Sequence, residues 1–320
     1  MGKINSSVRK TVASRPLPQA GLSLLRCQGW QHIFRALLFI FPCCVLFLYL
    51  SLSASAASGL KEDVEYLSST LLKGRGFGSC GAVEASWYVL RRFDAAGLDT
   101  SVGCFKTAKG VGHNIIGIHR GNPKSSSYVL VMAYFDGMGM LGDDILPGAD
   151  ANASGVAVLL ALADSLAGSR SNYIFAALDG HNADRAGAEA LCDGPWKLSM
   201  AVNIDIIGST LAPPNKYRPD FLIVLGGEKF EKQKSKEFDK LNEGTGLRLY
   251  YDYYRSKSFT DYFYNTASDQ APFLLKGIPA VMFTSGITMN TNKPEDSFDT
   301  LDYEVMARRS DFILNWLKTL

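Results

Sequence analysis

Histidine is scarce in this sequence of 320 residues. It occurs only at positions 32, 113, 119 and 181, so the chain beyond His181 offers no imidazole. His113 and His119 flank one expected strand, and side-chain alternation puts both on the same face. This arrangement favours a surface or structural role over a pair of metal ligands. Because zinc sites take three or four protein ligands, the shortage of imidazole argues against an ordinary zinc centre.

Motifs of other enzyme classes are also missing. The sequence has no G-x-S-x-G turn of the kind that presents a catalytic serine. The glycine-rich stretch at residues 74–81 lacks the GxxxxGK[ST] pattern that cradles phosphates. No cysteine stands in an obvious pairing with His181 as nucleophile and base. We therefore do not expect a serine hydrolase with this turn, a cysteine hydrolase that pairs with His181, or a P-loop enzyme.

Acidic residues are absent from the first 56 residues, which carry six basic residues and hence a charge of +6. The net charge of the whole chain is +2, which leaves −4 for the remainder. A mildly acidic main domain gives no reason to expect nucleic-acid binding.

The N-terminal segment is expected to direct export. Residues 36–60 contain no charge, and residues 36–52 are almost entirely apolar. Basic residues precede this run, and Ala54-Ser55-Ala56 follows it with the small-x-small pattern of a signal-peptidase site. The run is also long enough to span a bilayer.

Two alternatives therefore stay open: a signal peptide cleaved near Ala56, or a transmembrane anchor formed by residues 36–52. Either one places the chain after about residue 57 in the periplasm or outside the cell. We thus expect a leader at residues 1–57 and one domain at residues 58–320. Membrane contact is expected only through the N-terminal hydrophobic segment.

The exported part has only three cysteines: Cys80, Cys104 and Cys192. In an oxidising compartment one pair could form a disulfide, and Cys80 and Cys104 are the nearest in sequence. The alternative is that all three thiols are free.

The pattern of apolar runs predicts an α/β fold. Helices are expected at residues 60–72, 83–96, 153–166, 184–191, 230–241, 272–276 and 301–317. Strands are expected at residues 100–107, 114–119, 128–134, 173–178, 200–207, 221–225, 247–254 and 278–283. Continuous apolar strands that alternate with helices indicate a single three-layer domain, in which helices cover both faces of a mostly parallel, mixed sheet.

Residues 146–164 form the stretch around which the chain is organised. Asp150, Asn152 and Ser154 are typical capping residues, and strong helix formers follow from residue 153. Gly155 starts a helix of small residues, so we expect any side chain there to collide with a neighbouring strand. Ligands of such sheets bind beyond the carboxyl ends of the strands, where this loop is expected to lie.

The same stretch, PGADANASG, closely resembles the PGADDNASG segment of the M28 family of zinc aminopeptidases. Four further segments resemble motifs of that family and occur in family order: AYFDG (AHYDG in the family), FAALDGHN (FAxFDGEE), VNIDIIG (VNxDMIG) and NKPEDS (HTPEDT). The resemblance covers residues from about 60 to 320. It implies a zinc-exopeptidase-like fold.

Four of the family's five metal-ligand positions hold another residue. The resemblance places Tyr134 and Asn292 where the family has histidine ligands. Ala151 stands at the aspartate that bridges two metal ions, and Asn182 stands at a glutamate ligand. Only Asp205 is retained. No metal and no other cofactor is therefore expected.

The remaining family positions are mixed. His181 stands at the glutamate that acts as general base, whereas Asp136 is kept at the aspartate that orients a histidine ligand. Gln270 stands at the histidine of the family's SDH segment. Asp150, in the loop that carries Ala151, completes the expected ancestral pocket.

The resemblance thus implies an exported M28-like domain that is catalytically inactive and binds a peptide, a glycan or a partner protein, or serves as a structural subunit. The alternative is a metallo-aminopeptidase or related amidohydrolase with an altered metal site that holds zinc. Acid–base chemistry by His181 with a carboxylate partner belongs to the same alternative. The opposite interpretation is that the aspartates only hold loops and helix ends in place.

Overall fold

The computed structural model describes residues 57–253 and 255–320. The predicted leader, with its cleavage site or anchor, lies outside the described residues. Within the described part, one helix, Ala149–Leu166, is long and apolar enough to cross a membrane. Because 83% of it is buried inside the fold, it is a core helix.

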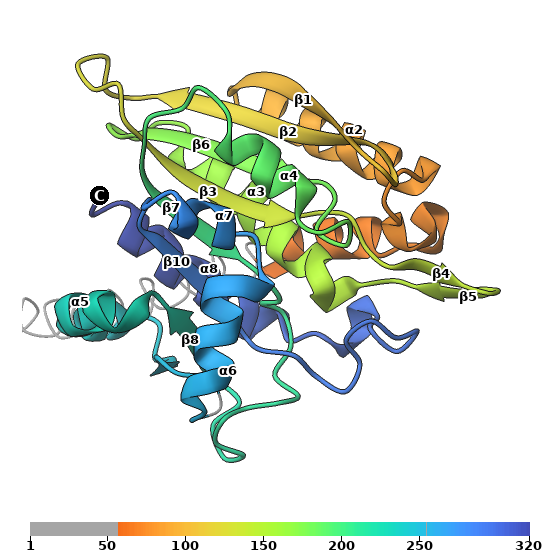
Figure 1. Cartoon of the computed structure of the whole chain (residues 1–320). Helices are drawn as coiled ribbons and strands as arrows, with labels where there is room; N and C mark the ends of the chain where they lie inside the picture. The colour runs from red at the N-terminus through yellow and green to blue at the C-terminus, as the bar shows by residue number, and fades with distance from the viewer. Residues whose placement is uncertain (1–56, 254) are drawn as a thin grey trace, which may run out of the picture. The chain divides into compact units, whose positions relative to one another are not determined.

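An eight-stranded mixed sheet forms the centre of the domain, with the strand order β1-β2-β6-β3-β7-β10-β8-β9 (Figure 1). The strands are β1 (Asp99–Thr107), β2 (Gly110–Arg120), β3 (Tyr128–Tyr134), β6 (Asn172–Leu178), β7 (Leu198–Ile204), β8 (Phe221–Leu225), β9 (Arg248–Tyr250) and β10 (Ala280–Thr284). The inner strands β6, β3, β7 and β10 run parallel to one another. The pairs β1–β2, β2–β6 and β10–β8 are antiparallel, whereas β8 and β9 are parallel.

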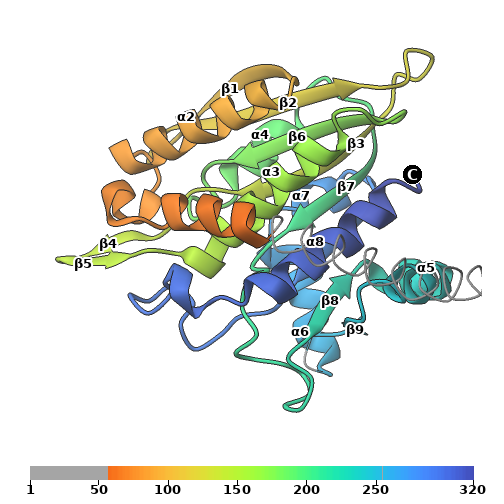
Figure 2. The same cartoon turned by 180° about the vertical axis from the view of Figure 1, so that it is seen from behind.

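Helices cover both faces of this sheet. Figure 2 shows α2, α3 and α8 on one face, and Figure 1 shows α4, α6 and α7 on the other. The helices are α2 (Cys80–Ala95), α3 (Gly155–Leu166), α4 (Ala186–Cys192), α5 (Gly227–Asn242), α6 (Lys257–Tyr262), α7 (Ala271–Leu275) and α8 (Tyr303–Leu317). A further helical segment spans residues 57–67. The predicted three-layer α/β architecture is confirmed.

The predicted boundaries hold best where a strand is buried. Strands β3 and β8 begin and end at the predicted residues, and β1 and β2 pair as an antiparallel hairpin. The expected strand at residues 247–254 is wrong in length, because β9 ends at Tyr250. Tyr253 instead turns into the core, where its ring stacks on Phe263 at 4.5 Å.

Several short elements were not predicted. The strands β4 (Gly139–Leu141) and β5 (Asp144–Leu146) form a hairpin that projects beside the sheet (Figure 1). A π-helical turn, η2 (Ala149–Ser154), precedes α3, and a second one, η3 (Phe263–Ala267), follows α6. These elements matter because η2 carries Ala151 of the predicted pocket, and the β4–β5 hairpin connects the loop after β3 to η2.

The capping prediction is correct only for Asn152, whose Oδ1 accepts a hydrogen bond from the Gly155 N–H at 3.2 Å. Ser154 makes no capping bond to α3; its hydroxyl donates to the Asp150 carbonyl and accepts from the Ile207 N–H in the loop after β7. The Asp150 carboxylate instead accepts from the backbone N–H groups of Gly208 and Ser209. Both side chains therefore serve the loop after β7 rather than the helix.

A side chain at Gly155 would collide, but not with a strand as expected. A Cβ atom there would lie 2.3 Å from Oδ1 of Asn152, the side chain that caps the helix. A side chain at Gly155 would therefore displace the Asn152 amide that caps the helix.

The three cysteines of the described residues are free. Cys80 and Cys104 are exposed and Cys192 is buried, so the structure contains no Cys80–Cys104 disulfide.

Candidate functional site

Loops at the carboxyl ends of the parallel strands converge on one pocket of about 120 Å³. Six residues of the predicted ancestral pocket line it: Tyr134, Ala151, His181, Asn182, Asp205 and Asn292. The opposite wall is apolar and includes Tyr253, Phe263, Met282 and Ile287. Positions that are up to 158 residues apart in the sequence thus share one cavity. The other three predicted residues, Asp136, Asp150 and Gln270, lie behind this lining and support it.

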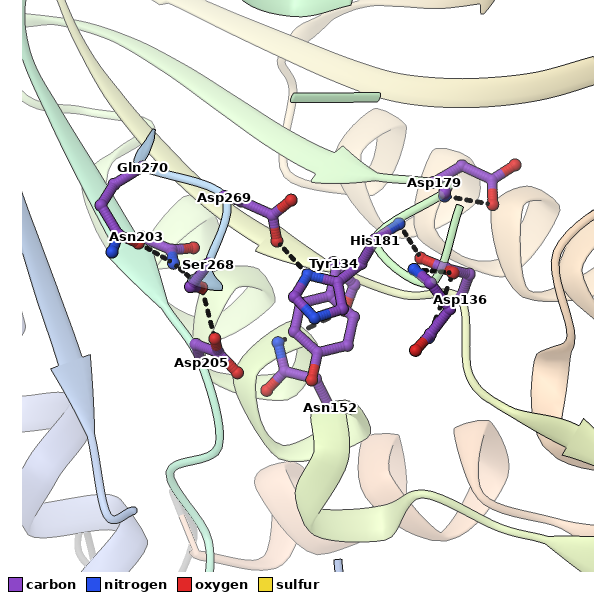
Figure 3. A network of polar contacts seen from close by, with 12 residues as sticks. Tyr134, Asp136, Asn152, Asp179, His181, Asn203, Asp205, Ser268, Asp269 and Gln270 are labelled. Carbon is purple, nitrogen blue, oxygen red and sulfur yellow. Dashed lines mark hydrogen bonds and ion pairs between the residues drawn. The ribbon is translucent and has the colours of Figure 1, made fainter. Parts of the chain in front are cut away.

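His181 is the central polar group of the pocket. Its Nδ1 lies 2.8 Å from Oδ2 of Asp269, and its ring stacks on the Tyr134 ring with centroids 3.7 Å apart and planes 9° apart (Figure 3). Burial disfavours the charged imidazole, but the carboxylates of Asp269, Asp205 and Asp136 outweigh burial and raise the pKa of His181 to about 9. His181 is therefore a cation at neutral pH.

Tyr134 replaces an expected imidazole with a neutral phenol. Its side chain is almost fully buried. Burial and the nearby carboxylate of Asp205 raise the pKa of the phenol well above its usual value. A phenol that stays protonated is a poor metal ligand, and its ring serves instead as a stacking surface for His181.

Asp205 stands at the edge of a hydrogen-bonded chain of polar side chains (Figure 3). Its Oδ2 accepts a short hydrogen bond from the Ser268 hydroxyl, whereas its Oδ1 is buried without a hydrogen-bond partner. Asn203 donates to the Ser268 hydroxyl at 2.8 Å and to Oε1 of Gln270 at 2.7 Å. Gln270 thus lies behind the pocket as a structural amide, and burial raises the pKa of Asp205.

Two further aspartates hold the loop that carries His181. Asp136 accepts hydrogen bonds from the backbone N–H groups of His181 at 2.8 Å and Asn182 at 3.0 Å. Asp179 accepts from the N–H groups of His113 at 3.0 Å and Gly180 at 2.8 Å. Burial and the charge of Asp136 raise the pKa of Asp179 to about 7. These contacts favour a role in loop geometry for both aspartates.

The loop that carries Ala151 rests on a buried network of acids and arginines. Asp296 accepts from the backbone N–H groups of Asp150 at 2.7 Å and Ala151 at 3.1 Å. Arg75 is fully buried and donates to the carbonyl groups of Phe135, Leu67, Pro147 and Gly148. It therefore joins the loop after β3 to the loop before α3.

A second buried arginine holds the loop after β7. Arg309 donates to the carbonyl groups of Phe221 at 2.7 Å, Ile207 at 2.8 Å and Ser209 at 3.0 Å. Burial and the charge of Asp296 raise the pKa of the neighbouring Asp150 to about 7. Backbone contacts to charged side chains thus fix the three loops around the pocket.

These residues do not fit a zinc centre. Among the described residues, no three His, Cys, Asp or Glu side chains are grouped so that they could hold a metal ion. The orphaned Oδ1 of Asp205 is one carboxylate donor, but Ala151 offers none and Asn182 and Asn292 offer neutral amides. His181 already gives its Nδ1 to Asp269 and carries a proton.

Two acidic residues of the site lie in recognisable segments but were not predicted as site residues. Asp269 lies in the SDQ segment and Asp296 in the NKPEDS segment, yet neither was identified as a site residue. Phe263, which lines the pocket beside Tyr253, was also not predicted, because it lies in the unpredicted element η3.

Comparison with known proteins agrees with this geometry. A model of peptidase family M28 matches residues 114–317. Comparison with curated protein sequences finds no match. The fold resembles BSAP, a zinc aminopeptidase from Bacillus subtilis, with a TM-score of 0.66 and 14% identity over 82% of this chain and 94% of that chain.

Other solved structures share the fold. An aminopeptidase from Aneurinibacillus sp. strain AM-1 has a TM-score of 0.66 and 13% identity over 82% of this chain and 93% of that chain. A glutaminyl cyclase from Porphyromonas gingivalis has a TM-score of 0.60 and 15% identity over 82% of this chain and 98% of that chain. At these identities the likeness shows the fold alone. The family model, which spans most of the domain, shows that the chain belongs to peptidase family M28.

Proposed function

We propose that this chain is an exported member of family M28 that has lost metal-dependent catalysis and acts as a binding or structural protein. A peptide, a glycan or a partner protein is the proposed ligand. One observation carries the proposal. Six family site positions line a single pocket, and among them only Asp205 is still a residue that binds metal in the family.

The protonation state of His181 supports the loss of catalysis. A general base must be unprotonated at the working pH. The pKa of His181 is about 9, because carboxylates surround the ring, so the imidazole carries its proton at neutral pH. The residue at the position of the family's base is therefore unsuited to accept a proton from water.

The competing proposal is a metallo-aminopeptidase or related amidohydrolase with an altered, zinc-holding site. The unpartnered Oδ1 of Asp205 favours it, since a buried acceptor without a donor is what a bound cation would satisfy. Zinc content after purification without chelator, measured together with hydrolysis of a panel of aminoacyl substrates, separates the two. About one zinc ion per chain with substrate turnover would refute the inactive assignment.

Restoring the family residues is a stronger test. The variant combines Tyr134→His, Ala151→Asp, His181→Glu, Asn182→Glu and Asn292→His. We expect it to bind zinc and to gain thermal stability with added zinc, because a ligand that binds only the folded state stabilises it by about 2.7 kcal/mol at 100 times its Kd. Gain of peptidase activity does not necessarily follow, because outer contacts must also orient the ligands.

The matched control adds Asp205→Asn to the same five substitutions and removes the one retained carboxylate. Its melting temperature should respond to zinc much less than that of the five-fold variant. If the five-fold variant folds, as judged by circular dichroism, and binds no zinc, the loops are not placed as the pocket requires.

A further inference from the structure

A second cavity lies between α2 and the β1–β2 hairpin and shares no lining residue with the family pocket. It has a volume of about 300 Å³ and is lined by Val83, Ser86, Trp87, Leu90, Val102, His113 and Ile115. We call it the α2 groove. Most of its lining is apolar, and no family motif falls on it.

The rim of the α2 groove exposes large apolar side chains to solvent. The exposed fractions are 53% for Trp87, 44% for Val102 and 41% for Val83. Three such side chains around one groove form a contiguous apolar surface, which marks an interaction site more often than scattered exposed residues do. Tryptophan is also the residue most typical of the boundary between water and lipid.

The segment that precedes the domain favours a lipid membrane as the partner of this surface. The apolar run predicted as an anchor ends at Leu52, and the first helical segment begins at residue 57. The intervening residues reach about 17 Å at full extension. If residues 36–52 stay in the bilayer, the helix at residues 57–67 is held next to the membrane surface.

That helix packs directly on α2. Tyr66 stacks on Tyr88 with centroids 4.3 Å apart, and the Tyr88 hydroxyl donates to Asp63 at 2.5 Å. Arg92 forms an ion pair with the same Asp63. Both helices lie in the layer that Figure 2 shows in front of the sheet. The tethered helix and the helix that forms the wall of the groove therefore belong to one rigid layer.

We infer that the α2 groove is a second membrane contact, through which the anchored domain lies on the lipid surface with Trp87 at the boundary between headgroups and acyl chains. The inference goes beyond the proposed function and is independent of the family pocket. It extends the expectation from sequence, which placed membrane contact only in the N-terminal hydrophobic segment. A short tether gives the groove a high effective concentration at the bilayer, so a weak surface affinity suffices.

Quenching of tryptophan fluorescence by brominated lipids tests this contact in the full chain. The chain is reconstituted in phosphatidylcholine nanodiscs with and without brominated acyl chains. All proteins carry Trp30→Phe, because Trp30 precedes the apolar run. Of the remaining tryptophans, Trp316 is fully buried, whereas Trp196 packs on Tyr128 in the layer on the other face of the sheet.

We expect brominated lipid to quench the tryptophan fluorescence of the parent, and Trp87→Phe to remove most of that quenching. The matched control, Trp196→Phe, should leave it in place. Quenching that survives Trp87→Phe unchanged overturns the inference. Two other results would also overturn it. One is a dimer that Trp87→Phe abolishes, which would show that the groove binds a second copy of the chain. The other is a mature chain that begins near Ala57 and therefore lacks the tether.

Discussion

Substitution of His181 by glutamine probes the charge at the centre of the family pocket. Glutamine keeps a polar side chain of similar size and removes the positive charge. Its loss leaves Asp269, which is fully buried, without the imidazolium that lies 2.8 Å away. Removing one partner of a buried ion pair is costly because the other charge stays buried without compensation.

The size of the effect follows from the pKa of His181. A folded-state value of about 9, against an ordinary value of 6.5, corresponds to about 3 kcal/mol of favourable interaction between the imidazolium and its surroundings. Because the pKa is raised on folding, this contribution is fully present below pH 6.5 and is lost as the pH rises through about 9. His181→Gln should therefore lower the free energy of unfolding by about 3 kcal/mol at pH 6 and by much less at pH 10.

Four residues from three parts of the chain face His181. They are Tyr134 at the end of β3, Asp136 after it, Asp205 after β7 and Asp269 before α7. Asp150 and Asp179, whose pKa values are raised to about 7, are present in both proteins, so their titration largely cancels in the difference.

Urea denaturation of the parent and the variant from pH 6 to pH 10 measures this difference. Asp269→Asn is the partner variant, and the double variant removes both charges. We expect the double variant to be more stable than the sum of the two single losses predicts. A loss that is equal at pH 6 and pH 10, or two losses that simply add, would refute a stabilising ion pair at this site.

Two further predictions concern packing and topology. Gly155→Val should lower the free energy of unfolding by about 1–3 kcal/mol, because its side chain displaces the Asn152 amide from the start of α3; an unchanged melting temperature would show that the amide moves freely. A reporter fused after Leu320 should be active only outside the cytoplasm, because basic residues precede the apolar run. N-terminal sequencing distinguishes cleavage near Ala56 from a retained anchor.

The sequence was sufficient to predict the fold class because buried strands carry their own pattern. Strand β3 is apolar at nearly every position and is buried along almost its whole length, so its bounds were readable. The run at residues 247–254 looked like a strand for the same reason, since it is rich in tyrosine. Its end is set by contacts from elsewhere: the Tyr253 N–H donates to Thr260, and the Tyr253 hydroxyl accepts from the Ile287 N–H.

The pocket lining was predictable because family motifs mark each position, and the structure brings six of the nine predicted residues to one cavity. The supporting contacts were not predictable. Asp269 is 88 residues from His181, and Asp296 is 145 residues from Ala151. No local pattern encodes such a pairing, because it depends on which strand ends the sheet places side by side.

The two buried arginines stabilise the pocket loops without contributing side chains to the lining of the pocket. Arg75 and Arg309 hold the pocket loops by their carbonyl groups, and Asp296 holds the loop of Ala151 by its N–H groups. Contacts to backbone groups do not depend on which side chains the loops carry. A substitution of a side chain that faces the cavity therefore leaves the contacts that hold the loops in place. Under the proposed loss of catalysis, these backbone contacts would preserve the shape of the pocket although its catalytic residues have been replaced.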